Sequence, residues 1–413
     1  MSTLHVIGAG LAGLSTAIVA KQHWPNVRVY EAAPHAGGRC RSFYDKSLGC
    51  LIDNGNHLIL GAYEETLDFA RTIGSLDTFN IVRPAEIPFT EPASGHEWVL
   101  RPNRGPIPFS LLFKSRRVPE TTLSDLIRDL KKLALADSNN SIFETLTPST
   151  PLFKRLWEPL TLGILNTPAE TASAQLFWAA LKRTLLKGEQ SCRPYLPLSS
   201  LSASLIEPAI DKIGRVAFNK RLKIMEHSDG KVKALVFNDE TVKLASNDAA
   251  VLALPPEAAQ SLLPDLIAPK GANTILNLHF KLEGKARLKN GRSFLGLVGT
   301  TSQWIFLKDR VASVTVSAAN DVEYPKLAET VWREISPYLQ TPQDLPPHKI
   351  IREKRATFDQ TPENTKLRPP TTTAVHNLFL AGDWIDTGLP ATIESAVLSG
   401  RLAEAEARNR FLI

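Results

Sequence analysis

The sequence of 413 residues has few cysteines, and this scarcity limits its chemistry. Cys40, Cys50 and Cys192 are widely spaced and form no Cys-x-x-Cys pair. An odd number of isolated cysteines argues against a disulfide scaffold and a zinc site, and favours a reducing compartment. We therefore expect a cytoplasmic protein with no bound metal.

The sequence also lacks long apolar runs and basic tracts. No run of about 18 or more uncharged apolar residues occurs, so no transmembrane helix is predicted. The apolar segment 4–20 has no basic region before it, which argues against a signal peptide. The net charge of +6 is modest, and no dense Lys/Arg run with interleaved aromatic residues occurs. We expect no nucleic-acid partner.

What the sequence does contain is a strong motif at its start. Residues 3–7 form a predicted buried strand, and Gly8-Ala-Gly10-Leu-Ala-Gly13 follows at once. An apolar helix is predicted from about residue 14 to 23, and a second strand over 26–31 ends in an acid. A strand, glycine turn, helix and strand, with an acid about 20 residues after the glycines, indicate a dinucleotide-binding unit.

Each residue type in this motif has a physical role. Gly8 permits the tight turn, Gly10 lets the backbone approach a pyrophosphate, and Gly13 lets helix and strand pack closely. The phosphates are expected at the helix start, and Glu31 is expected to accept hydrogen bonds from the ribose hydroxyls. An acid there suits an unphosphorylated ribose, hence FAD or NAD. The following Gly37-Gly38-Arg39 loop adds a guanidinium near phosphate and favours FAD.

Three motifs together identify a superfamily. The segment GAGLAGLSTA, the spacing from Glu31 to Gly37-Gly38-Arg39, and LAGDW…GLPATIESA after residue 379 resemble the FAD-dependent amine oxidase and phytoene desaturase superfamily. This resemblance implies an α/β fold: a discontinuous Rossmann-like FAD-binding domain and an α+β substrate domain. It also implies that the last helix starts at the flavin ring, where its positive end stabilises charge on the reduced ring.

The resemblance assigns candidate residues and boundaries. The FAD-binding domain is expected over 1–75, 198–256 and 371–413, with a helical substrate part over 76–197 and a sheet part over 257–370. Periodicity predicts a helix over 121–136 and strands over 231–237 and 249–254. The predicted cofactor-binding residues are Gly8, Gly10, Leu11, Ala12, Gly13, Glu31, Gly38, Arg39, Gly55, Asn56, Val216, Gly382, Asp383, Pro390, Ala391, Thr392 and Ile393.

More specific signatures point to one family within the superfamily. Asp53-Asn-Gly-Asn-His57, the WEPL…LNTP pattern over 156–168 and the segment 387–392 resemble hydroxysqualene dehydroxylases of hopanoid biosynthesis. Asn56 departs slightly from that family, where Gln is typical. The resemblance implies reduction of an allylic alcohol to squalene and water, with hydride from reduced flavin. His57 is the first candidate for the acid or polar anchor, and Asp386 is the second.

A C30 substrate implies contact with a membrane. Residues 101–117 combine five cations with apolar residues and are predicted to touch anionic lipid as a peripheral protein at the inner face of the membrane. Only one dinucleotide fingerprint is present, so the electrons are expected from NAD(P)H without a second Rossmann unit, or from a separate redox partner.

Three other interpretations stay open. A carotenoid-type desaturase would use the same fold to oxidise a polyene. An amine oxidase would need an aromatic cage, for which the C-terminal loop offers only Trp384. A flavin-binding assembly subunit without chemistry of its own is the third.

Overall fold

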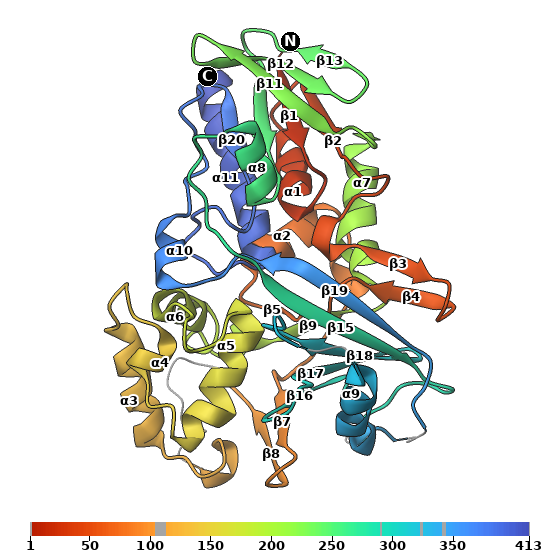
Figure 1. Ribbon diagram of the computed structural model, residues 1–413, viewed down its shortest axis with the longest axis vertical. Coiled ribbons are helices and arrows are strands. Elements are labelled where there is room, and N and C mark those ends of the chain that lie inside the picture. The colour runs from red at the N-terminus through yellow and green to blue at the C-terminus, as the bar shows by residue number, and fades with distance from the viewer. Residues whose placement is uncertain (1, 104–112, 290, 323–324, 341–343, 413) are drawn as a thin grey trace.

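The computed structural model describes residues 2–103, 113–289, 291–322, 325–340 and 344–412. Two sheets form the centres of two halves of the molecule. The half that contains both termini has a parallel sheet, and the other half has a larger mixed sheet flanked by helices (Figure 1). Within the described residues, no helix has the length and apolarity needed to span a bilayer.

The parallel sheet has five strands in the order β10-β2-β1-β14-β20. Their bounds are Thr3–Ile7 (β1), Asn26–Tyr30 (β2), Val216–Ala217 (β10), Ala249–Leu252 (β14) and Leu378–Leu380 (β20). These strands come from the beginning, middle and end of the chain, and all neighbours pair in parallel. The order of the strands is that of a doubly wound sheet, whose ligands bind beyond the carboxyl ends of the strands.

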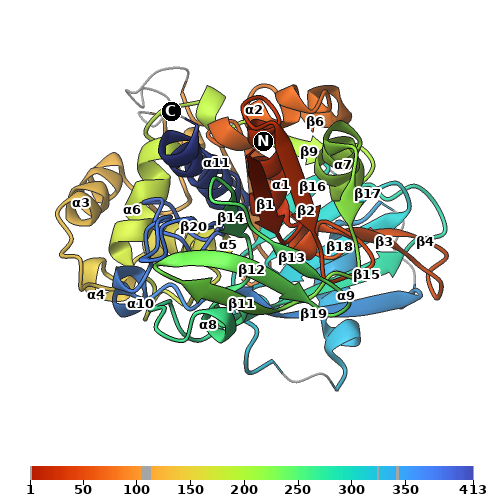
Figure 2. The ribbon, with the colours of Figure 1, turned by 90° about the horizontal axis from the view of Figure 1, so that it is seen from above.

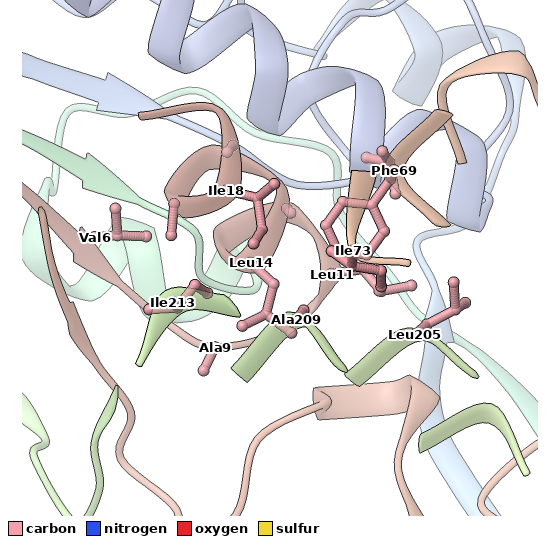
Figure 3. Packing of buried hydrophobic residues seen from close by; sticks show 14 of the residues in the cluster. Val6, Ala9, Leu11, Leu14, Ile18, Phe69, Ile73, Leu205, Ala209 and Ile213 are labelled. Atoms are coloured by element: carbon pink, nitrogen blue, oxygen red, sulfur yellow. The ribbon is translucent and has the colours of Figure 1, made fainter. Parts of the chain in front are cut away.

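Helices α1 (Leu11–Ala20) and α11 (Ile393–Phe411) cover one face of this sheet (Figure 2). Figure 3 shows Leu14 and Ile18 of α1 packed among side chains of α2 (Glu64–Thr72) and α7 (Glu207–Ile213). A Cβ at Gly400 would lie 2.2 Å from the Ala12 carbonyl oxygen, so glycine allows the two helices to touch. The opposite face carries the meander β11 (Leu222–Ser228), β12 (Lys231–Phe237) and β13 (Thr241–Lys243), and helix α8 (Pro256–Leu262).

The larger sheet has seven strands in the order β19-β15-β18-β17-β16-β7-β8. Their bounds are Ile87–Glu91 (β7), His96–Leu100 (β8), Asn273–Lys281 (β15), Phe294–Leu297 (β16), Trp304–Lys308 (β17), Val311–Val316 (β18) and His348–Thr357 (β19). Pairing is antiparallel except between β16 and β7. Helix α9 (Leu327–Ile335) packs on one face, where it buries an apolar cluster with β15 and β18.

A helical layer lies beside the other face: α3 (Leu123–Ala134), α4 (Ile142–Thr145), α5 (Glu158–Leu165) and α6 (Ala174–Arg183). A π turn over Phe153–Trp157 leads directly into α5. Pro159, in the first turn of α5, has no N–H for the helical ladder, and the widened turn before it accommodates this loss. Beyond this turn, Leu160 and Ile164 of α5 pack against the apolar cluster beside the sheet.

The remaining elements connect the halves. They are β3 (Ser42–Asp45), β4 (Cys50–Asp53), β5 (Ile59–Leu60), β6 (Phe79–Ile81), β9 (Pro194–Pro197) and α10 (Pro362–Lys366).

The helices and strands predicted from the sequence are present in the structure, but some of them begin or end a few residues away from the predicted position. The first helix begins at Leu11 rather than residue 14 because Gly10 already serves as its N-cap. The predicted helix over 121–136 spans Leu123–Ala134, and the strand predicted over 249–254 ends at Leu252.

Candidate active site

A cavity of about 850 Å³ lies between the two halves. One wall is formed by residues just beyond the carboxyl ends of strands of the parallel sheet: Gly8, Glu31, Ala253 and Gly382. The opposite wall contains side chains of β15, β17 and β18, together with α5 and α6. The cavity is therefore where a doubly wound sheet is expected to bind its ligand.

In the glycine turn, one glycine has room for a Cβ atom and the other two do not. A Cβ at Gly10 would meet no atom within 4 Å, whereas one at Gly8 would lie 2.4 Å from the Ala253 carbonyl oxygen and one at Gly13 only 1.9 Å from that of Gly8. Gly8 also has a φ of +107°, which favours glycine. The first intrahelical bond runs from Leu14 N–H to Gly10, so the earlier N–H groups of α1 can bind an anion.

Glu31 is held at the end of β2 by backbone donors. Its carboxylate accepts hydrogen bonds from the N–H groups of Ala9 and Ala33, each at 2.8 Å. Both oxygens keep further lone pairs for a ligand in the cavity. This arrangement is compatible with the predicted contact to ribose hydroxyls.

Arg39 and Asp383 join the two ends of the chain. The guanidinium donates to both carboxylate oxygens of Asp383, at 2.9 and 2.7 Å, and to the Ala356 carbonyl at 2.6 Å. Asp383 raises the pKa of Arg39 above its ordinary range. The Arg39 guanidinium therefore binds Asp383 in a bidentate manner, an interaction that the sequence did not predict.

The C-terminal loop is fixed by side chains that the sequence analysis missed. The buried guanidinium of Arg368 donates to the carbonyls of Leu389 and Ile385, at 2.6 and 2.5 Å. Gln360 accepts from the Ala391 N–H at 2.8 Å. The sequence predicts the first turn of the last helix over 391–394, whereas helix α11 begins at Ile393, with Thr392 as its N-cap. No local motif marks Arg368 or Gln360, because they act on a loop distant in sequence.

His57 lines the cavity, and its surroundings keep it neutral. Burial lowers the pKa of His57 to about 4, and nearby Asp53 only partly offsets this effect. A neutral imidazole has one N–H donor and one acceptor nitrogen. At pH 7 the ring is therefore a polar anchor or a proton relay and does not carry a permanent charge.

An apolar wall forms the rest of the cavity. Its lining includes Leu58, Ile87, Leu100, Leu160, Ile164, Leu181, Leu185, Trp304 and Phe306. Gly163 faces Trp304 from α5, and a Cβ there would lie 3.3 Å from the indole Nε1. The indole ring therefore packs closely against α5 at the position where a side chain would begin. These residues come from distant parts of the chain, and the sequence analysis did not group them.

The structure brings most of the predicted residues to this cavity. Those in its lining are Gly8, Gly10, Leu11, Ala12, Glu31, Gly38, Arg39, Gly55, Asn56, His57, Gly382, Asp383, Pro390, Ala391, Thr392 and Ile393. Gly13 and Val216 lie outside the lining: Gly13 packs under the turn, and Val216 pairs with Val29 in the sheet. Their contacts to a cofactor stay predictions, as do those of the lining residues.

Asp386 requires a correction. Its side chain is exposed outside the cavity lining, and its Oδ1 accepts from the Gly388 N–H within the same loop. The loop turns there because Arg368 holds the preceding carbonyls, so the carboxylate faces solvent. This position does not support the predicted role of Asp386 in catalysis. Trp384 is also absent from the lining, since its buried ring donates to the Leu254 carbonyl.

The residues present fit FAD. The open Gly10 position, the free N–H groups of α1 and the Glu31 carboxylate form a cradle for an adenosine and its phosphates. Gly38 and Gly382 lie in the same lining, and the start of α11 lies further along it. A cavity of this size, joined to an apolar wall, can hold a long cofactor and an apolar ligand together.

Comparisons with known proteins agree with this geometry. The flavin-containing amine oxidoreductase family matches residues 11–406. Hydroxysqualene dehydroxylases of Zymomonas mobilis and Rhodopseudomonas palustris are 38% and 40% identical to this chain, over 98% and 97% of both partners. A zeta-carotene desaturase of Zea mays is 22% identical over 97% of this chain and 82% of its own. A putrescine oxidase variant shares the fold, with a TM-score of 0.73 and 14% identity over 99% of this chain and 100% of that chain.

The chain belongs to the flavin-containing amine oxidoreductases, and within them to the family of the hydroxysqualene dehydroxylases. It is an FAD-dependent oxidoreductase with a Rossmann-like α/β fold. The predictions of fold class, family and cofactor are confirmed.

Proposed function

We propose that this enzyme converts hydroxysqualene to squalene and water. The observation that carries the proposal is one cavity that combines the dinucleotide cradle with an apolar wall and a neutral histidine. The family of the chain supports the same substrate. Long isoprenoid chains require an apolar wall, and a hydroxyl group within it requires a polar partner.

The reaction breaks one C–O bond and forms one C–H bond. When bound in its reduced form, FAD would supply the hydride, and one proton is needed for the oxygen to leave as water. His57 donates its N–H to the hydroxyl oxygen as the C–O bond weakens. Because a neutral ring can release a proton from one nitrogen while its other nitrogen accepts one from solvent, it can relay the proton without becoming a buried cation.

The apolar wall has a second task. An allylic centre that loses its hydroxyl becomes cation-like and would react with any nearby water. Side chains such as Leu160, Ile164 and Phe306 exclude water from that part of the cavity. The enzyme thereby favours reduction over return to an alcohol.

The test is a conversion assay with purified enzyme under anaerobic conditions. Hydroxysqualene is incubated with enzyme whose FAD is kept reduced, and extracted lipids are analysed by mass spectrometry. Squalene should form only with the reductant. If the alcohol is recovered unchanged, the proposal is wrong, and oxidised enzyme that desaturates a polyene would establish the desaturase alternative.

We also propose that the enzyme works at the inner membrane surface. Residues 104–112 of the predicted lipid-contact segment lie outside the described residues. In the described part of this segment, Phe113 is exposed beside Lys114 and Arg116, and further along the chain α3 exposes Ile127 together with Lys131. Apolar side chains among cations suit a peripheral contact with anionic lipid. Flotation with anionic but not neutral vesicles is expected, and equal flotation with both would contradict this contact.

The source of electrons is a separate proposal. A single dinucleotide fingerprint supports reduction by NAD(P)H without a second Rossmann unit, or by a redox partner. Reduction of the bound flavin by NADH or NADPH alone, followed by its visible absorbance, would distinguish the two.

A further inference from the structure

A cluster of hydrogen-bonded polar side chains lies in the cavity wall beside His57. Asn277 of β15 and Thr315 of β18 are directly opposite each other in the sheet, and both line the cavity. The Thr315 hydroxyl donates to Asn277 Oδ1 at 3.1 Å. Asn56, which precedes His57, donates to both residues. Buried polar groups of this kind are retained only where they are satisfied or meet a ligand.

The hydrogen bonds fix the orientation of both amides. Asn277 Oδ1 accepts from the Asn56 N–H at 3.4 Å, from Asn56 Nδ2 at 3.3 Å and from Thr315. Asn277 Nδ2 donates to the Asn54 carbonyl at 3.2 Å. A flipped Asn277 amide would point its NH₂ group at the Asn56 N–H and its oxygen at the Asn54 carbonyl. The orientation is therefore determined by the network.

This arrangement leaves one acceptor of Asn56 available. Both hydrogens of its Nδ2 are used, since one goes to Asn277 Oδ1 and the other to Thr315 Oγ1 at 3.1 Å. Among the described residues, no donor contacts Asn56 Oδ1, and the residue lines the cavity. The adjacent His57 ring adds an N–H donor. An acceptor on Asn56 and a donor on His57 in the same cavity lining match a hydroxyl group, which is itself both donor and acceptor.

We propose that Asn277 and Thr315 are positioning residues that aim the Asn56 amide oxygen at the hydroxyl group of the substrate. The substrate O–H donates to Asn56 Oδ1, and the same oxygen accepts from His57. This inference rests on the proposed function. It changes the predicted role of the Asn56 side chain from cofactor to substrate, while the backbone there can still border the cofactor. The sequence could not reveal it, because Asn56, Asn277 and Thr315 lie in three distant segments.

The test compares binding of an alcohol with binding of the matching hydrocarbon. Hydroxysqualene and squalene are titrated separately into oxidised enzyme, where no turnover occurs, and the visible flavin spectrum reports binding. Wild type should prefer hydroxysqualene. Thr315→Val keeps the volume but removes the hydroxyl, and should reduce that preference about fivefold to tenfold with squalene affinity unchanged. Asn277→Ala should have a similar effect, and Thr315→Ser should restore the preference.

A matched control comes from the next pair on the same face of the sheet. Ser313 bonds to the buried His279 at 2.7 Å and is absent from the cavity lining. Ser313→Ala should keep the wild-type preference. If Thr315→Val retains bound FAD and the full preference, the positioning role is wrong while the proposed function stands. If wild type neither binds nor reduces hydroxysqualene, both proposals fail.

Discussion

The two ends of the cavity are built in opposite ways. The cofactor end uses short local motifs, in which Gly8, Gly10 and Glu31 lie within 24 residues and act mainly through backbone geometry. The substrate end is formed by single residues from many elements, such as Ile87, Gly163 and Trp304. The cofactor end therefore tolerates little change in shape, whereas the substrate end can change by single substitutions without loss of the fold. Family members can share FAD and differ in what they act on.

The largest expected effect is within the glycine turn. Gly13→Ala places a Cβ 1.9 Å from the Gly8 carbonyl oxygen, so we expect destabilisation of about 3 kcal/mol or more. Gly10→Ala meets no atom within 4 Å and should fold normally, yet lose FAD because the methyl group occupies space beside the phosphates. Urea unfolding and flavin content measure the two effects. Equal stability of both variants would contradict the assignment of roles.

The next effect concerns the link between chain ends. Arg39→Ala leaves the buried Asp383 carboxylate without its bidentate partner, which should cost about 2 kcal/mol and lower FAD retention. Arg39→Lys keeps the charge but loses the fork, so it should lie between wild type and alanine. Thermal unfolding of FAD-loaded protein checks the order. A lysine variant equal to wild type would show that charge alone suffices.

A smaller and more selective effect is expected at the substrate end. Gly163→Leu would displace the Trp304 ring from its place against α5 and should lower kcat/KM for hydroxysqualene about tenfold, with FAD content unchanged. Gly163→Ala gains up to about 1 kcal/mol of helix propensity in α5, which its 3.3 Å contact with the indole Nε1 partly offsets, and should reduce turnover slightly. Steady-state kinetics measure the change in turnover, and thermal unfolding measures the change in stability. Loss of FAD in these variants would contradict the claim that the substrate end can change without an effect on the cofactor end.

The smallest effect of a single substitution is expected on the pH dependence of stability. Burial lowers the pKa values of His5, His57 and His279 to about 4. Each histidine takes up a proton near pH 6.5 when unfolded but not when folded, so stability is lost as pH falls from about 6.5 towards 4. The loss is at most about 1.4 kcal/mol per pH unit for each ring. In urea unfolding, His57→Asn should reduce the dependence of the unfolding free energy on pH between 6.5 and 4. An unchanged dependence would mean that His57 is not held in its neutral form by the folded protein.

These contrasts explain what the sequence could predict. The first two strands of the parallel sheet, the glycine turn and the start of α11 follow from patterns within about 30 residues, so their location could be predicted. The exact start of α1 was misplaced because the glycine motif overlaps its first turn. Arg368, Gln360, Asn277 and Thr315 contribute through contacts across more than 20 residues of sequence, which periodicity cannot detect. The motif position of Asp386 could not predict that its side chain is exposed outside the cavity lining.

The most direct test of the account is a single-turnover stoichiometry. Photoreduced enzyme is mixed anaerobically with excess hydroxysqualene, and flavin reoxidation is followed together with the squalene extracted at each time. One squalene should appear for each FAD reoxidised, at the same rate. Reoxidation without squalene, or reduced flavin that persists beside unchanged alcohol, would contradict the reductive dehydroxylation proposed for this cavity.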